Sequence, residues 1–313
     1  MGFWPKWQYK EYVEKHSSRA EGMKLLHDHG EPWDHRYSSI HVGLESLPDW
    51  MSYLNIVSLN DRDLNFRALV QQYQLEARQH IESVKPRLDQ IQQRQTGSAL
   101  LAEISASDWT VVIQPYRGKG LNATSGQRTG HDDVSATARG APVDRMSNPF
   151  GKRYDGRVGT GKGADAIVNF TPGMWKGAKM RKPSNAPDET LFHELVHASR
   201  QTRGVQDSSY VDNDYDDSEE YLAVVLTNIY MSEKGQLVMV GNHGTKPLQG
   251  PERDNFINNS QHTLLAPQQL MQNFKDSQRA FYDALANLPA TIKWNPVRQH
   301  NEFRRQHDTT PFF

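Results

Sequence analysis

The chain of 313 residues contains no cysteine, which excludes disulfide bonds, thiolate metal ligands and a cysteine nucleophile. It has no run of eighteen apolar residues, so no membrane span is expected. It also lacks an excess of basic charge, since 36 lysines and arginines face 37 acidic residues, and nucleic acid is not an expected partner. The first residues lack the apolar core of a secretory signal peptide. A metal ion bound by this chain must therefore be held by histidine, aspartate or glutamate.

The motif HELVH begins at His193 and ends at His197. On an α-helix, residues four apart share a face, so both imidazoles can reach one metal ion. Glu194 would lie beside that metal, placed to take a proton from a bound water. A helix is predicted here because Asp188 can cap its start and Gly204 can stop it. The alternative is a surface helix with two solvated histidines, but the spacing on a capped helix favours zinc.

The third ligand of the zinc ion must come from elsewhere, because a catalytic zinc normally has three protein ligands and a water. The metzincin pattern requires a histidine six residues beyond His197, but that position is Arg203. Further along, an acidic stretch precedes an apolar helix that Asp217 or Ser218 can cap and Gly235 can end. A helix crossing the first one would bring a glutamate to the metal, as in gluzincins.

Two adjacent glutamates, Glu219 and Glu220, compete for this role. They point about 100° apart on a helix, so only one can ligate well. Ala223 would let the two helices approach closely beside Glu220, and we therefore predict Glu220 as the ligand, with Glu219 as its neighbour. The alternative is that the acidic residues only start a helix, with or without a calcium ion, although their spacing does not fit an EF-hand loop.

A zinc site that activates water also needs a donor for the developing oxyanion. The candidates are His243, in a glycine turn, and Tyr210 and Tyr215, just before the second helix. The sequence does not separate them.

The remainder of the chain shows several weaker patterns. Residues 1–60 are rich in aromatics, and residues 61–95 have helical spacing that Pro86 is expected to kink or split. A strand is predicted over 109–115, and residues 118–146 are expected to form a loop or flap because they show no period. A strand at 166–172 ends in proline, which suits a sheet edge.

Glycine recurs four times in residues 156–163, as it does in nucleotide-binding loops. The stretch lacks the Gly-Lys-Ser/Thr ending and the flanking strand and helix that phosphate binding requires. A tight turn before the next strand is the better interpretation.

Four segments together resemble the NleD-like effector metalloproteases: residues 98–104, 167–172, 191–198 and 219–224. That family includes bacterial type III effectors and toxin domains carried by Rhs and VgrG proteins. The resemblance covers residues 97–235 and is most specific at the two expected metal helices. The stretch 220–223 is also similar to the third-ligand helix of anthrax lethal factor, which supports Glu220 over Glu219.

The resemblance and the patterns imply an α+β fold. We expect a zincin-like metalloprotease domain with a small mixed sheet and two metal-bearing helices, preceded by a mainly helical N-terminal region. Residues 1–96 would serve delivery, adaptor docking or substrate recognition, and residues 97–313 would form the peptidase domain with a C-terminal helical extension. The function expected is a secreted effector or toxin that hydrolyses peptide bonds of a protein substrate, with Zn²⁺ as cofactor and Glu194 as general base.

The same resemblance implies export by a dedicated secretion system, such as type III or type VI, and action in the cytoplasm or periplasm of a target cell. An immunity protein or a secretion adaptor would be the further partner. Two other functions stay open from the sequence. One is a zinc-stabilised binding or adaptor protein without catalysis, and the other is a zinc amidase that acts on peptidoglycan peptides.

Overall fold

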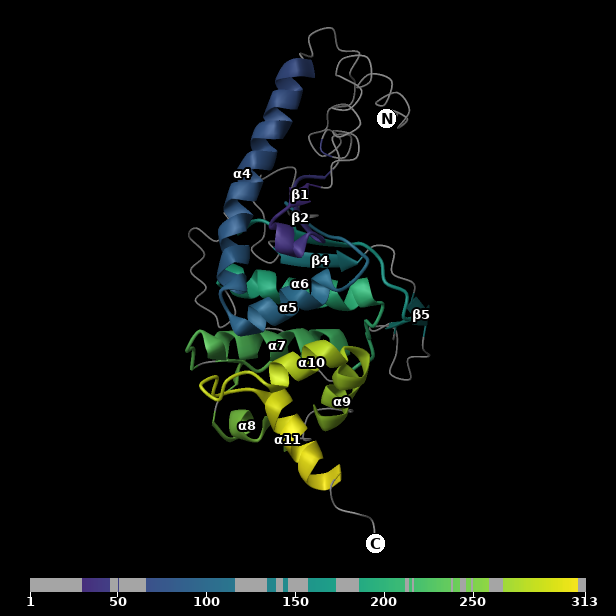
Figure 1. The fold of residues 1–313 in the computed structure, drawn as a ribbon, viewed down its shortest axis with the longest axis vertical. Coiled ribbons are helices and arrows are strands. Elements are labelled where there is room, and N and C mark those ends of the chain that lie inside the picture. The colour runs from purple at the N-terminus through teal and green to yellow at the C-terminus, as the bar shows by residue number, and fades with distance from the viewer. Residues whose placement is uncertain are drawn as a thin grey trace.

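The computed structural model describes residues 30–45, 50, 66–115, 134–138, 143–145, 157–172, 186–211, 214–215, 217–237, 239–242, 246–248, 250–258 and 267–308. Their fold is mixed α+β and layered (Figure 1). A small sheet lies against helices α5 and α6, helix α7 lies on the other side of these, and the C-terminal helices cover α7 (Figure 1).

The sheet has five strands in the order β1-β2-β3-β7-β4. The three central strands run parallel, and the strands at both edges run antiparallel to their neighbours. The strands are β1 (Glu31–Pro32), β2 (Ile40–Val42), β3 (Val111–Gln114), β7 (Ala166–Phe170) and β4 (Val134–Ala138). The sheet is therefore small and mixed, as predicted, and β3 and β7 coincide with the two strands expected from their β-branched runs.

Two expectations about these strands are wrong. The strand at 166–170 is not an edge strand, because β7 pairs with β3 on one side and with β4 on the other. The segment 118–146 is not simply a loop, since it contains β4 and also β5 (Val143–Arg145), which pairs with β6 (Arg157–Gly159). The outer strand on this side of the sheet is β4.

Helix α4 (Phe66–Gln92) runs through Pro86 without a break, so the predicted helix is long but not split. A short turn joins it to α5 (Gln95–Ser105). This turn depends on Gly97, because a Cβ atom there would collide with the carbonyl oxygen of Ile91. Strands β1 and β2 and the 3-10 helix η1 (His35–Tyr37) precede α4, so one sheet joins segments from both sides of the boundary expected at residue 96.

Helices α6 (Pro187–Arg203) and α7 (Ser218–Glu233) form the centre of the molecule. Most of α7 is buried around its whole circumference, which is why its sequence is apolar without a polar face. One side packs on α6, and the other is covered by segments beyond residue 236. The elements beyond residue 236 are β8 (Met239–Val240), β9 (Pro247–Leu248), α8 (Gly250–Asp254), the 3-10 helix η3 (Phe256–Asn258), α9 (Pro267–Ser277), α10 (Arg279–Ala286) and α11 (Pro296–Asp308). Of these, β8 and α9 pack on α7, and α10 packs on α5.

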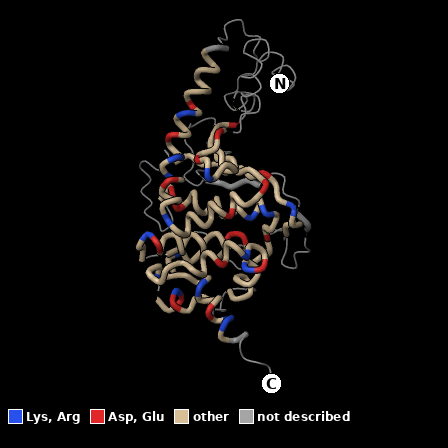
Figure 2. Tube along the Cα trace, viewed as in Figure 1, with Lys and Arg blue, Asp and Glu red and all other residues tan. Residues whose placement is uncertain are grey.

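Among the described residues, none of the helices combines the length and apolarity needed to cross a bilayer. Figure 2 shows lysine and arginine interleaved with aspartate and glutamate along the described chain, in keeping with the net charge of −1.

Candidate metal centre

Helix α6 begins one residue earlier than its predicted cap. Its N-cap is Ala186, and Pro187 occupies the first helical position, where a missing N–H costs nothing. Asp188 therefore lies inside the first turn, and the prediction that it caps the helix is wrong. Glu189 supplies a capping contact instead, because its Oε2 accepts a hydrogen bond from the Ala186 N–H at 3.3 Å. The helix ends at Gly204 with a left-handed φ of 66°, as the sequence predicts.

Helix α7 starts at the predicted cap. The Asp217 carboxylate accepts a hydrogen bond from the backbone N–H of Glu220 at 3.0 Å, which fixes the first turn of the helix. The helix ends at Glu233, and Gly235 follows with a φ of 78°. Both ends of α7 therefore lie where local sequence rules place them, and Glu220 is the third residue of the capped helix.

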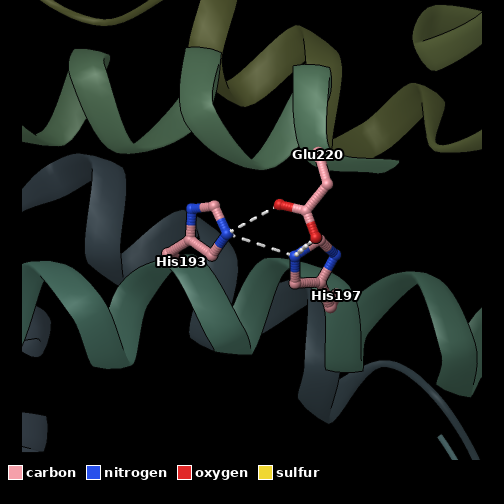
Figure 3. A group of neighbouring side chains, drawn as sticks. All are labelled: His193, His197 and Glu220. Carbon is pink, nitrogen blue, oxygen red and sulfur yellow. Dashed lines mark hydrogen bonds and ion pairs between the residues drawn. The ribbon is translucent and has the colours of Figure 1, made fainter. Parts of the chain in front are cut away.

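Three side chains from these two helices converge on one point (Figure 3). The Nε2 atoms of His193 and His197 lie 3.2 Å apart. Glu220 directs one carboxylate oxygen to His193 Nε2 at 3.2 Å and the other to His197 Nε2 at 3.5 Å. Each residue offers a ligand atom, and these atoms all lie within 4.8 Å of one another. Among the described residues, this group is the one cluster of histidine and carboxylate side chains with the geometry of a metal site.

The spacing of these donor atoms fits a tetrahedral metal ion. Zinc binds imidazole nitrogen and carboxylate oxygen at about 2.0–2.2 Å, so neighbouring ligands in a tetrahedron stand about 3.3–3.5 Å apart. The two histidine nitrogens are 3.2 Å apart, close to such an edge, and each lies 3.2 or 3.5 Å from a different oxygen of the Glu220 carboxylate. Three ligands of this kind also leave a fourth position for water, which is typical of catalytic rather than structural zinc sites.

The electrostatics of the cluster favour a cation. Burial by itself would lower the pKa of His197, but the charges of Glu220, Glu219 and Glu194 raise that pKa well above its ordinary value. Burial would raise the pKa of Glu220, but the neighbouring histidines hold it well below the usual range. Burial raises the pKa of Asp217 to about 7, and the two glutamates beside it add to the shift. The carboxylates of Glu194, Glu219 and Glu220 therefore act together on His197, and their negative charge favours a bound cation.

Comparison with known protein families matches residues 71–236 to Peptidase_M91, a family described as effector protein. The matched segment is just over half of the chain and includes both helices that carry the cluster. The chain belongs to the Peptidase_M91 family. Peptidase_M91 is a metallopeptidase family, and the effector label implies secretion and action on a protein substrate in a host or target cell. No curated protein and no solved structure matches the chain.

Salt bridges join α6 and α7 of this M91 chain on both sides of the cluster. Arg200 Nε donates to Glu219 Oε1 at 2.6 Å where α6 ends and α7 starts. Lys234, just past the end of α7, places its Nζ 2.7 Å from Asp188 and 2.6 Å from Glu189 in the first turn of α6. The two helices are thus antiparallel and are joined by salt bridges at both ends. The ligand atoms of His193, His197 and Glu220 lie between these salt bridges.

The glycine-rich turn of this M91 chain holds the end of α6. Gly159 N donates to Gln206 O at 2.7 Å, and Gly161 N donates to Gly204 O at 2.9 Å. A Cβ atom on Gly159 would collide with the Gly204 carbonyl, so the approach requires glycine. The turn therefore packs against a helix C-terminus, which agrees with the interpretation that it is not a nucleotide loop.

The other candidate residues occupy different positions. Glu194 is buried and lies close enough for its charge to raise the pKa of His197. Tyr210 forms an isolated β-bridge with Asp217 at the start of α7, whereas the ring of Tyr215 packs edge-to-face on Tyr221 with 5.0 Å between ring centroids. His243 lies outside the described residues. The backbone of each tyrosine thus lies beside Asp217, at the start of the helix that carries the glutamate.

Two residues near the cluster, Arg200 and Gln278, were not predicted from the sequence. Arg200 lies one turn beyond His197 and on the side facing α7, a spacing that could have identified it. Gln278 accepts a hydrogen bond from Arg200 Nη1 at 3.2 Å, although it is 78 residues further along the chain. No local signal marks Gln278, because it precedes a short helix beyond the region matched to the M91 family.

Proposed function

We propose that this protein is a zinc endopeptidase of the gluzincin type, with His193, His197 and Glu220 as the zinc ligands. The observation that carries this proposal is the convergence of two imidazole nitrogens and one carboxylate, from two helices joined by salt bridges, within the reach of a single metal ion. Membership of a metallopeptidase family supports the same assignment. Glu219 is not a ligand in this proposal, because its carboxylate is engaged by Arg200.

The chemistry then follows from the side chains around the site. A zinc ion held there would act as a Lewis acid, lowering the pKa of its water and polarising the scissile carbonyl. Glu194 takes the proton from the attacking water and delivers it to the departing amine nitrogen, so that the C–N bond breaks as the C–O bond forms. Glu194 suits this role because it lies between the two histidines in the sequence and is shielded from bulk water.

We further propose that an extended substrate pairs with the edge of β4 that faces away from β7, which has no strand beside it in the described part of the chain. This strand is the outermost member of the sheet on the side next to α6, and it packs on that helix. Addition of a substrate strand to a sheet edge fixes a peptide backbone by main-chain hydrogen bonds, which suits a protease. The protein would be exported by a dedicated secretion system and act in the cytoplasm or periplasm of the target cell, where an immunity protein could neutralise it.

The test uses the full-length chain and three variants. Glu194→Gln should retain one bound zinc and lose catalysis, because it removes the base and leaves the ligands. His193→Ala should lose the zinc, whereas His35→Ala should behave as wild type because the His35 side chain is 92% exposed and far along the chain. Zinc content is measured after dialysis, and activity is measured as growth arrest on expression in the cytoplasm or the periplasm. Undiminished toxicity of Glu194→Gln would overturn the mechanism.

A further inference from the structure

One buried side chain at the start of α10 forms hydrogen bonds to helix α6. Gln278 precedes α10, is 3% exposed, and lies beyond the segment matched to the M91 family. Its carbonyl oxygen accepts from Arg200 Nη1 at 3.2 Å. Its amide nitrogen donates to Glu103 Oε1 at 3.3 Å and approaches Ser199 Oγ at 3.4 Å. The amide is therefore oriented by a guanidinium on one side and a carboxylate on the other.

Arg200 is fixed by three acceptors that surround its guanidinium. Nε donates to Glu219 Oε1 at 2.6 Å, Nη2 donates to the Val205 carbonyl at 2.6 Å, and Nη1 donates to Gln278. The planar guanidinium has its donors in a rigid fork, so the three bonds together determine where Nε points. Loss of the Gln278 bond would leave a buried N–H without its acceptor and allow the fork to rotate.

Glu219 in turn faces a proposed zinc ligand. Its Oε1 accepts from Arg200 and from the backbone N–H of Asp207 at 2.6 Å, which leaves Oε2 directed at His197 Nδ1, 3.9 Å away. The opposite ring nitrogen, His197 Nε2, is the one that faces His193 and Glu220. A carboxylate on the far nitrogen of a metal-binding imidazole fixes the orientation and tautomer of the ring.

We propose that Gln278 is a positioning residue for the metal site, acting through the buried chain Gln278–Arg200–Glu219–His197. This inference rests on the proposed function, since it takes His197 as a ligand. Through this chain, the C-terminal helices contribute to metal binding as well as covering α7. A glutamine suits the position because its oxygen meets the Arg200 cation and its nitrogen meets the Glu103 carboxylate.

A positioning role for Gln278 and a role in packing alone predict different results when this residue is replaced. If Gln278 only holds the C-terminal helices in place, any variant that destabilises those helices equally should affect zinc binding equally. Asn295 provides the matched comparison. It is a buried amide in the same helical region, donates to Leu285 O at 2.8 Å, accepts from Arg298 N at 3.0 Å, and has no hydrogen bond to α6 or α7 among the described residues.

The experiment compares Gln278→Met with Asn295→Leu in the full chain, since both replace an amide by an apolar group of similar shape. Zn²⁺ affinity is measured by competition with a chelator, the free energy of unfolding is measured in EDTA, and the absorption of the Co²⁺-loaded protein reports ligand geometry. Gln278→Met should weaken Zn²⁺ binding about 3- to 10-fold, below the 10- to 100-fold typical of residues that touch a ligand directly. It should also change the Co²⁺ spectrum. Asn295→Leu should change neither, although it destabilises the fold.

The outcomes separate this inference from the proposed function. If wild type binds Zn²⁺ and His193→Ala does not, but Gln278→Met binds as tightly as wild type, the positioning role is wrong and the zinc site stands. Equal weakening by Asn295→Leu would also overturn the positioning role. If wild type binds no Zn²⁺, both proposals fail. If Gln278→Met does not fold, the same measurements are made on Gln278→Asn, which keeps the amide but shortens the side chain by one methylene.

Discussion

Arg200 and Glu219 form a buried ion pair, with 2.6 Å between Nε and Oε1, beside the glutamate that reaches the two histidines. Burial would raise the pKa of Glu219, but Arg200 and then His197 lower it. The two adjacent glutamates of α7 therefore have different partners, since Glu219 faces a cation inside the protein and Glu220 faces the imidazoles. This division of roles is the basis of the first prediction.

Glu220→Gln should mainly reduce zinc binding, whereas Glu219→Gln should mainly reduce the stability of the fold. Glu220→Gln removes a proposed ligand and should lose stoichiometric zinc with little loss of stability in EDTA. Glu219→Gln should keep one zinc per chain but lower the free energy of unfolding by about 3 kcal/mol, because it leaves the buried Arg200 without its counter-ion. Zinc content and urea unfolding in EDTA measure the two effects. Zinc lost from Glu219→Gln and retained by Glu220→Gln would exchange the roles of the two residues.

Lys234→Met should destabilise the protein, because it leaves the buried carboxylates of Asp188 and Glu189 without a cation. We expect a loss of about 3 kcal/mol, the lower end for breaking a buried pair, because Lys234 is partly exposed. The control is Lys246→Met, which breaks an exposed pair with Asp214 and should cost less than about 1 kcal/mol. Both free energies are measured by urea unfolding in EDTA. Equal losses of stability in the two variants would show that the salt bridges of Lys234 do not hold α6 and α7 together.

Gly163→Ala should lower stability by about 1–3 kcal/mol, because the added Cβ would collide with the Thr202 carbonyl and with the ring of Trp109. The comparison is Gly161→Asn. Gly161 has open space around it and a φ of 81°, a conformation that asparagine tolerates better than most residues, so the cost there should be small. Thermal unfolding measures both variants. If Gly163→Ala unfolds at the same temperature as wild type, the turn does not pack tightly on α6.

The histidine pair and three of the four ends of α6 and α7 were predictable because they follow from local rules. The spacing of His193 and His197, the cap at Asp217 and the stop at Gly204 all depend on residues within one or two turns. The cap of α6 was misassigned because Pro187 takes the first helical position, so the N-cap is Ala186, two residues before Asp188. These features need no knowledge of distant contacts.

The features that were missed depend on contacts between distant segments. Strand β7 is central because β4 pairs with it, and the five small residues of β4 lie within a long polar segment that does not look like a strand as a whole. Gln278 contacts Arg200 and Glu103 across 78 and 175 residues of chain, and nothing in its own neighbourhood marks it. Sequence periodicity reports which face of an element is buried, but it does not report which element covers that face.

His300 should make stability depend on pH. It is buried on α11 with Nδ1 2.7 Å from the Tyr282 hydroxyl, and burial, with Lys275 and Arg304 nearby, lowers its pKa to about 4 from an ordinary value of 6.5. The folded state therefore favours the neutral ring, so its contribution is complete above pH 6.5 and is lost as the pH falls from 6.5 to 4. The free energy of unfolding should fall by about 2–3 kcal/mol over this range. His300→Gln, which keeps a polar partner for Tyr282 but cannot titrate, should show a smaller fall in urea unfolding at a series of pH values, and parallel curves for the two proteins would contradict the prediction.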